Sequence, residues 1–227
     1  MASAQPRLLR RYTDVLSVLD MVVHRRITLL SPSNWADLND RHGMETFAEQ
    51  SGVREAYAFC MTGARETSQH WKVFPDSGFG ACVIFHRSRM LKGLEKHSTV
   101  LHGPVNYRKH AELARLAPIP TARLPFLKRE VFSDEREYRL VATVPDSVAL
   151  GSKTVGIELD WIQRIVFAAN IPRPLVETLE GLVRAQNGCA ELNLRFSRMP
   201  ENQVWAEAFA KASSVDPKPP LKLLLGH

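Results

Sequence analysis

The chain has 227 residues, of which 44% are apolar and 24% are charged, with 12 Gly, 14 Pro and 3 Cys. This composition excludes disordered, collagen-like and disulfide-scaffold proteins, and the length suffices for a self-supporting hydrophobic core. The formal net charge of +6 favours an anionic partner. Because no basic arm concentrates this charge, a compact anionic ligand in a cleft is favoured over a long polyanion that the protein wraps.

The cysteines and the N-terminal segment bear on location. Cys60, Cys82 and Cys189 are odd in number and far apart in the sequence, which is typical of a reducing cytoplasm. An apolar stretch follows the N-terminal arginines, but Asp14 and Asp20 interrupt it and no small-residue cleavage site follows. No segment approaches the ~20 apolar residues that span a bilayer. We therefore expect a soluble cytoplasmic protein, of an oligomeric state that the sequence does not predict.

Helix and strand signals alternate in the first part of the chain. Thr13 or Asp14 is placed to cap the first helix, and Ser33 is placed to cap a short piece after a Ser-Pro turn. The strand over 79–86 is apolar on both faces and is expected at the centre of a sheet. The segment over 62–78 is expected to be a functional loop. The elements predicted here are helix 14–24, strand 26–30, helix 39–50, strand 55–62 and strand 79–86.

The second part continues the alternation and then weakens. Pro217, Pro219 and Pro220 predict an extended tail over 201–227. Residues 1–200 show no repeat and no domain boundary. They predict a single α+β domain with a mixed, mainly antiparallel sheet flanked by helices. The elements predicted here are helix 88–96, strand 99–107, helix 109–116, a short segment 126–130, strands 136–144, 154–159 and 164–168, helix 174–184 and strand 191–196.

The strand over 136–144 carries the most informative charges. Period-two alternation places Tyr138 and its alternate neighbours in the core, and places Glu135, Glu137 and Arg139 on the other face. Carboxylates at the start of a strand project over a cleft from a fixed backbone, which favours a catalytic role. The alternative is a solvated strand end, where a Glu137–Arg139 surface pair contributes at most about 1 kcal/mol.

Several stretches together resemble the bacterial family called domain of unknown function 2971. The family's final Glu-x-Glu-Tyr-Arg motif is the most specific part, and it is present here at 135–139. Arg41, Lys72 and Phe74 depart from the family's usual residues. The matching stretches are Arg11-Tyr12-Thr13, Ser31-Pro32 with Asn39-Asp40, His70-Trp71-Lys72-Val73-Phe74, Gly80 to Phe85, Lys128 with Phe132, and Glu135-Arg136-Glu137-Tyr138-Arg139.

Three features together also resemble the three-part site of mono-ADP-ribosyltransferases, whose co-substrate is NAD. They are the Glu-x-Glu at the start of a strand, an earlier strand that ends in a small hydroxyl residue, and an N-terminal strand that carries an arginine or an aromatic residue. The resemblance implies that Glu137 stabilises the oxocarbenium-like charge as nicotinamide leaves, and that Glu135 activates a protein or nucleic-acid acceptor. It also implies that Thr62 supplies a hydroxyl. The residues that would bind NAD are Arg10 or Arg11 at the pyrophosphate, Tyr12 or Trp71 stacked on a ring, and Arg139.

Each of these assignments has a structural alternative. Arg10 and Arg11 also fit surface charges, Thr62 also fits a strand end, and Trp71 also fits a core residue. A binding module without catalysis is the competing function, in which Arg139 and Lys128 recognise an anionic nucleotide or a nucleic-acid end. The eight histidines form no metal-ligand pattern, and no glycine-rich phosphate loop is present, so no metal is expected.

Overall fold

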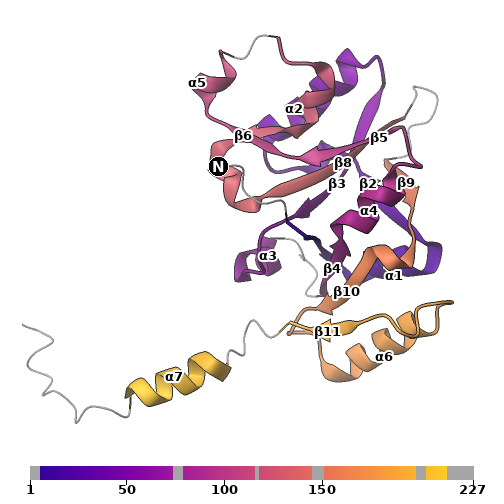
Figure 1. Cartoon of the computed structure of the whole chain (residues 1–227), viewed down its shortest axis with the longest axis vertical. Coiled ribbons are helices and arrows are strands. Elements are labelled where there is room, and N and C mark those ends of the chain that lie inside the picture. The colour runs from indigo at the N-terminus through magenta and orange to yellow at the C-terminus, as the bar shows by residue number, and fades with distance from the viewer. Residues whose placement is uncertain (1–5, 74–78, 116–117, 145–150, 198–202, 214–227) are drawn as a thin grey trace, which may run out of the picture.

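The structure is a computed structural model that describes residues 6–73, 79–115, 118–144, 151–197 and 203–213. A nine-stranded sheet lies at its centre. Its strand order is β11-β10-β4-β1-β3-β2-β9, and β3 also pairs with β8, which pairs with β5 (Figure 1). The strands are β1 Leu8–Asp14, β2 Arg26–Leu30, β3 Glu55–Thr62, β4 Gly80–His86, β5 Val100–Pro104, β8 Glu137–Val144, β9 Ser152–Gly156, β10 Ile162–Phe167 and β11 Leu194–Phe196.

The pairing confirms the predicted α+β class with a mixed, mainly antiparallel sheet. Only β10 and β11 pair in parallel among the described strands of this sheet, and helix α6 (Arg173–Arg184) connects them. A separate parallel ribbon joins β6 (Asn106–Arg108) to β7 (Leu127–Arg129). β4 lies between β1 and β10 and is buried along nearly its whole length, as its apolar sequence predicts.

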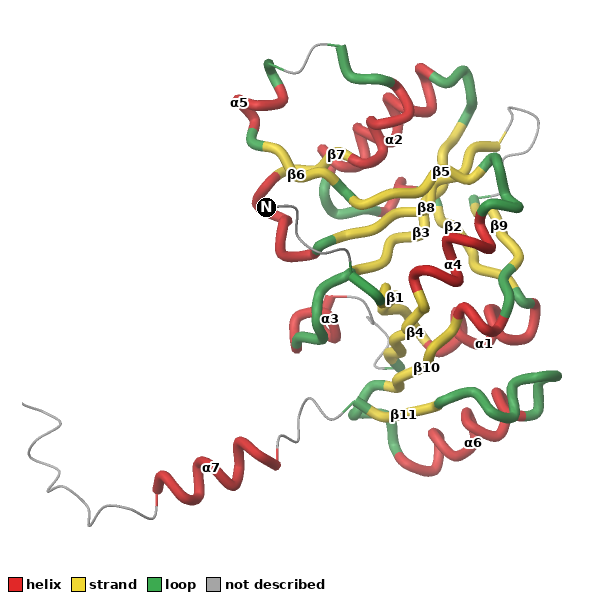
Figure 2. Tube along the Cα trace, in the orientation of Figure 1, coloured by secondary structure: helices red, strands yellow, loops and turns green. Residues whose placement is uncertain are grey.

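Helices cover both faces of the sheet (Figure 2). One face carries the main core, in which α1 (Val15–His24), α4 (Arg87–Leu94) and α6 pack on β1, β3, β4, β8 and β10. On the opposite face, α2 (Leu38–Gln50) places Met44, Phe47 and Ala48 on β3 and β8. Trp71 of α3 (Ser68–Val73) packs beside it on β1, β4 and β10. The sheet is therefore buried on both sides, and its second face is shared between α2 and α3.

Local capping explains where several elements begin. Asp14 accepts a hydrogen bond from the Ser17 backbone N–H at 2.8 Å, so Asp14 is the cap of α1. Asp37 caps α2 in the same way, through Asn39. The prediction of Ser33 as a cap is wrong, because Ser31 accepts the bond that starts the 3-10 helix η1 (Pro32–Asn34).

Three other predictions differ from the structure. The loop predicted over 62–78 contains α3, and the residues that follow α3, including Phe74, lie outside the described part. The strand predicted over 99–107 divides into β5 and β6, which belong to different sheets. Within the predicted extended tail, an alanine-rich stretch of high helix propensity forms α7 (Gln203–Ser213). The three tail prolines lie outside the described residues, and the boundary at residue 200 stays a prediction.

The remaining elements are short. They are α5 (His110–Leu113) and the 3-10 helices η2 (Thr121–Phe126), η3 (Glu130–Glu135) and η4 (Leu159–Trp161). Across the described ranges, the helices are all too short or too polar to cross a bilayer.

Candidate active site

Five residues on five adjacent strands form one row across the second face of the sheet. The backbone register pairs Glu137 of β8 with Thr62 of β3, and Thr62 with Arg10 of β1. It continues from Arg10 to Ile84 of β4, and from Ile84 to Arg164 of β10. Directly paired residues project from the same face of a sheet. We call this set the register row, and it aligns three residues that the sequence predicted as parts of one site.

A group of buried charges surrounds Arg139, two residues along β8 from Glu137. The Arg139 guanidinium donates to both carboxylate oxygens of Asp40, at 2.7 and 2.6 Å, and to both of Glu137, at 2.7 and 2.8 Å. Lys128 Nζ lies 2.6 Å from Glu135, 3.2 Å from Glu137 and 3.4 Å from Asp40. We call these five residues the Arg139 cluster. Two cations face three carboxylates, so the cluster has a net charge of −1 when all five are ionised.

Burial rules out the solvated strand end that the sequence left open. The Arg139 side chain is 1% exposed and that of Glu137 is 8% exposed. The guanidinium also lies 4.9 Å from the centre of the Trp35 ring and donates to the Pro125 carbonyl at 2.9 Å. A pair in this setting is not a surface salt bridge, because both groups have lost their water and depend on each other.

The pKa values of the two glutamates in the Arg139 cluster are shifted in opposite directions. Burial alone would raise the pKa of Glu137, but the hydrogen bonds and charge of Arg139, with the charge of Lys128, lower it to about 2. Burial raises the pKa of Glu135 above its usual value, and its bond to Lys128 offsets only part of that effect. Glu137 is therefore held ionised, whereas Glu135 is the carboxylate better placed to take up a proton.

A backbone turn holds the two glutamates next to each other. Arg136 adopts a left-handed conformation with φ of 43°, which ends η3 and starts β8. Thr62 Oγ1 donates to the Glu135 carbonyl and accepts from the Ala64 N–H at 2.9 Å. The Thr62 hydroxyl therefore ties the end of β3 to the turn before β8, which is a positioning role that the sequence did not predict.

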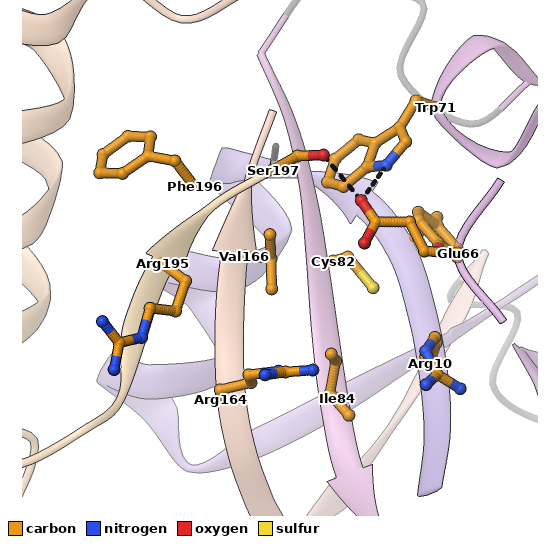
Figure 3. A pocket seen from close by; sticks show the side chains of 11 residues that line it. Arg10, Glu66, Trp71, Cys82, Ile84, Arg164, Val166, Arg195, Phe196 and Ser197 are labelled. Atoms are coloured by element: carbon orange, nitrogen blue, oxygen red, sulfur yellow. Dashed lines mark hydrogen bonds between the residues drawn. The ribbon is translucent and has the colours of Figure 1, made fainter. Parts of the chain in front are cut away.

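A pocket of about 390 Å³ lies on the other half of the same face (Figure 3). Arginines from three strands, β1, β10 and β11, contribute to its lining: Arg10, Arg164 and Arg195. Its floor is apolar and includes Ile84, which stands between Arg10 and Arg164 in Figure 3. We call this site the arginine pocket.

An acidic residue and aromatic rings close one end of the arginine pocket. Glu66 Oε1 accepts from Trp71 Nε1 at 2.8 Å and from Ser197 Oγ at 2.7 Å (Figure 3). The Tyr12 ring stacks on His70 with ring centres 4.8 Å apart and meets Trp71 edge-on at 5.2 Å. Glu66 is the sole carboxylate among the lining residues, so the charges of the arginine pocket sum to +2.

The sequence-predicted residues therefore fall into two adjoining groups. Arg10, Tyr12 and Trp71 line the arginine pocket, whereas Glu135, Glu137 and Arg139 belong to the Arg139 cluster. Thr62 lies between the groups in the register row. Arg11 points to the opposite face of the sheet, where it donates to the Cys60 carbonyl at 3.0 Å and lies over the Phe59 ring. Of the two candidate arginines, Arg10 is the one on the face of the site.

A second groove of about 620 Å³ borders the Arg139 cluster from the side of α2, and Asp40 and Lys128 contribute to its wall. Leucines from α5, η2 and β7 contribute apolar surface to its other walls: Leu113, Leu124 and Leu127. In the described ranges, no three His, Cys, Asp or Glu side chains are arranged to hold a metal ion.

The comparisons with known proteins add little to this geometry. No family model matches the chain, and no curated protein matches it, so the resemblance to domain of unknown function 2971 stays a prediction. Among solved structures, the chain is similar to Thermus sp. 2.9 DarT in complex with NAD+. The TM-score is 0.43 at 8% identity, over 87% of this chain and 98% of that chain. A likeness of this degree carries no weight for activity or ligand.

Proposed function

We propose that the protein transfers ADP-ribose from NAD to a protein or nucleic-acid acceptor. The observation that carries the proposal is the register row, which aligns Arg10, Thr62 and Glu137 on three adjacent strands. Neighbouring strands are about 4.8 Å apart, so Arg10 and Glu137 start roughly 10 Å from each other along the row. That separation suits a dinucleotide whose phosphates lie at Arg10 and whose nicotinamide ribose lies at Glu137.

The chemistry of the proposed reaction follows from the charges of the two glutamates. The bond between ribose C1′ and the nicotinamide nitrogen breaks, and nicotinamide leaves as a neutral molecule with the bonding electrons. Positive charge then develops on C1′ and the ring oxygen, next to the carboxylate of Glu137, whose lowered pKa keeps it ionised. The acceptor attacks C1′ and gives its proton to Glu135, whose pKa is raised by burial.

Residues of the arginine pocket support the same proposal. Arg10 donates one N–H to the Ala64 carbonyl at 2.9 Å, which fixes its position and leaves other donors of the guanidinium for phosphate oxygens. Trp71 and Tyr12 present aromatic surface at one end of the pocket, where the adenine ring would stack.

One observation favours the alternative of a nucleotide-binding module without catalysis. Both oxygens of Glu137 already accept hydrogen bonds, from Arg139 and from Lys128. A carboxylate so engaged stabilises less external charge than a carboxylate that faces a ligand alone. In this alternative the arginine pocket binds an anionic nucleotide and Glu137 serves to hold the buried Arg139.

Incubation with NAD separates these two functions. The transferase is expected to release nicotinamide and to transfer labelled ADP-ribose, and Glu137→Gln is expected to lower the rate by roughly a hundredfold or more. Glu177→Gln is the matched control, because Glu177 is 68% exposed on α6. Thermal denaturation of each variant shows whether the lost activity reflects unfolding. If the wild-type protein binds a nucleotide but releases no nicotinamide, the binding module is the correct function.

A further inference from the structure

We propose that Arg164 and Arg195, together with Arg10, form a diphosphate subsite in the arginine pocket, and that this subsite binds a nucleoside diphosphate such as ADP on its own. The ligand class rests on the proposed function, because the ADP moiety of NAD contains both of its phosphates. The sequence motifs pointed to Arg10 but not to Arg164 or Arg195. ADP is accordingly expected to compete with NAD.

The register places Arg10 and Arg164 symmetrically. Both pair directly with Ile84, from β1 on one side and from β10 on the other. Two strand spacings separate them, which is roughly 10 Å between Cα atoms. Long side chains that start this far apart on one face are able to converge on one ligand above Ile84. Figure 3 shows Arg164 and Arg10 on either side of Ile84, with Arg195 on the strand next to that of Arg164.

β11 adds the third guanidinium through its parallel pairing with β10. Arg195 pairs with Val166, which is two residues beyond Arg164, so Arg195 joins the pocket from its outer edge. Arg195 is exposed, whereas Arg10 and Arg164 are half-buried. A ligand that enters from solvent would meet Arg195 before it reaches the two inner arginines.

The charges of the three arginines are only partly balanced within the pocket, where Glu66 is the one carboxylate of the lining. Among the described residues, none of the three forms an ion pair. The Nε atom of Arg164 is buried without a hydrogen-bond partner in the same part of the chain. Like charges that are gathered on an apolar floor repel one another, and an anion relieves the repulsion. The Arg139 cluster on the same face shows the opposite arrangement, since each of its cations touches carboxylates.

The charge and size of the pocket indicate a diphosphate. The three arginines and Glu66 sum to +2, which matches the −2 of the pyrophosphate in NAD. A volume of about 390 Å³ lies within the range of small-molecule sites. One guanidinium group donates hydrogen bonds to two phosphate oxygens at once, so the three arginines have enough donors for two adjacent phosphates.

The test is titration calorimetry of the full chain with ADP, inorganic pyrophosphate and adenosine. ADP and pyrophosphate are expected to bind, adenosine is expected to bind far more weakly, and added salt is expected to weaken the binding of both anions. Arg164→Gln and Arg195→Gln should each weaken ADP binding by about tenfold to a hundredfold. Arg173→Gln, which removes a 91% exposed arginine of α6, should leave ADP binding unchanged.

Three results would overturn the inference: no ADP binding at millimolar concentration, unchanged binding in the two pocket variants, or equal weakening by Arg173→Gln. If Arg164→Gln does not fold, Arg195→Gln decides, because Arg195 is exposed. Nicotinamide release by the same proteins separates this inference from the proposed function. If ADP binding depends on these arginines but no nicotinamide is released, the transferase proposal alone is refuted. If nicotinamide is released and the KM for NAD is unchanged in Arg164→Gln and Arg195→Gln, the subsite alone is refuted.

Discussion

Replacement of Arg139 by methionine tests whether the Arg139 cluster holds the fold together. Methionine keeps much of the side-chain volume but removes five hydrogen bonds, two to Asp40, two to Glu137 and one to the Pro125 carbonyl. It leaves the carboxylates of Asp40 and Glu137 buried with Lys128 as their remaining cation. Breaking a buried ion pair in this way costs about 3–5 kcal/mol of unfolding free energy. For a domain of this size the melting temperature should fall by about 10 °C.

Urea denaturation of the wild-type and Arg139→Met proteins measures this loss directly. The loss should be larger at pH 8 than at pH 5. Without Arg139 the folded-state pKa of Glu137 rises, and a carboxylate with a raised pKa destabilises the fold increasingly as the pH rises. A triple variant that also carries Asp40→Asn and Glu137→Gln should recover part of the stability, since it buries no unpaired charge. A loss below about 1 kcal/mol, or one equal to that of Arg173→Met, would refute the reasoning.

Three further predictions concern backbone and charge. Gly93→Ala should lower the unfolding free energy by about 3 kcal/mol or more in chemical denaturation, because a Cβ at this position would overlap the Trp161 ring. Arg136→Gly should raise the melting temperature slightly, by relieving about 1 kcal/mol of left-handed strain; a fall would show that the Arg136 side chain contributes more than the strain costs. The pKa of Glu137, about 2 against the usual 4.5, means that its contribution to stability is present above about pH 4.5 and declines toward pH 2. Urea denaturation over this range should show a decline that Glu137→Gln lacks.

Local patterns predicted most of the secondary structure. The strands over 26–30 and 55–62 have the bounds of β2 and β3, because each is a short apolar run between turn residues. The strand predicted over 136–144 has the end of β8 and starts one residue before it, since β8 begins at Glu137. Helix α7 was missed because the pattern after residue 200 is weak. The division of β5 from β6 was missed because one strand-like stretch does not reveal that its two halves pair with different strands.

The candidate site was predicted only where its residues lie close in sequence. Glu135, Glu137 and Arg139 follow from one alternating strand, but Asp40 precedes Arg139 by 99 positions and no spacing rule connects them. Arg164 and Arg195 were missed for the same reason, since an arginine in an apolar strand has no local signature of a pocket. The pairing of β1, β4, β10 and β11 brings Arg164 and Arg195 to the side of Arg10, and the packing of α2 on the sheet brings Asp40 to Arg139. Both arrangements are properties of the folded chain.

The shortness of β11 has a consequence for the dynamics of the arginine pocket. β11 has three residues, lies at the edge of the sheet and is held by one parallel ladder to β10. Short edge strands open more easily than central ones, so the amides of β11 should exchange with solvent before those of β3 and β8. Opening there would remove Arg195 and release the Ser197–Glu66 bond in one movement. The outer wall of the pocket would thus act as its entrance. Binding of a ligand in the pocket should then slow the exchange of the β11 amide hydrogens with solvent.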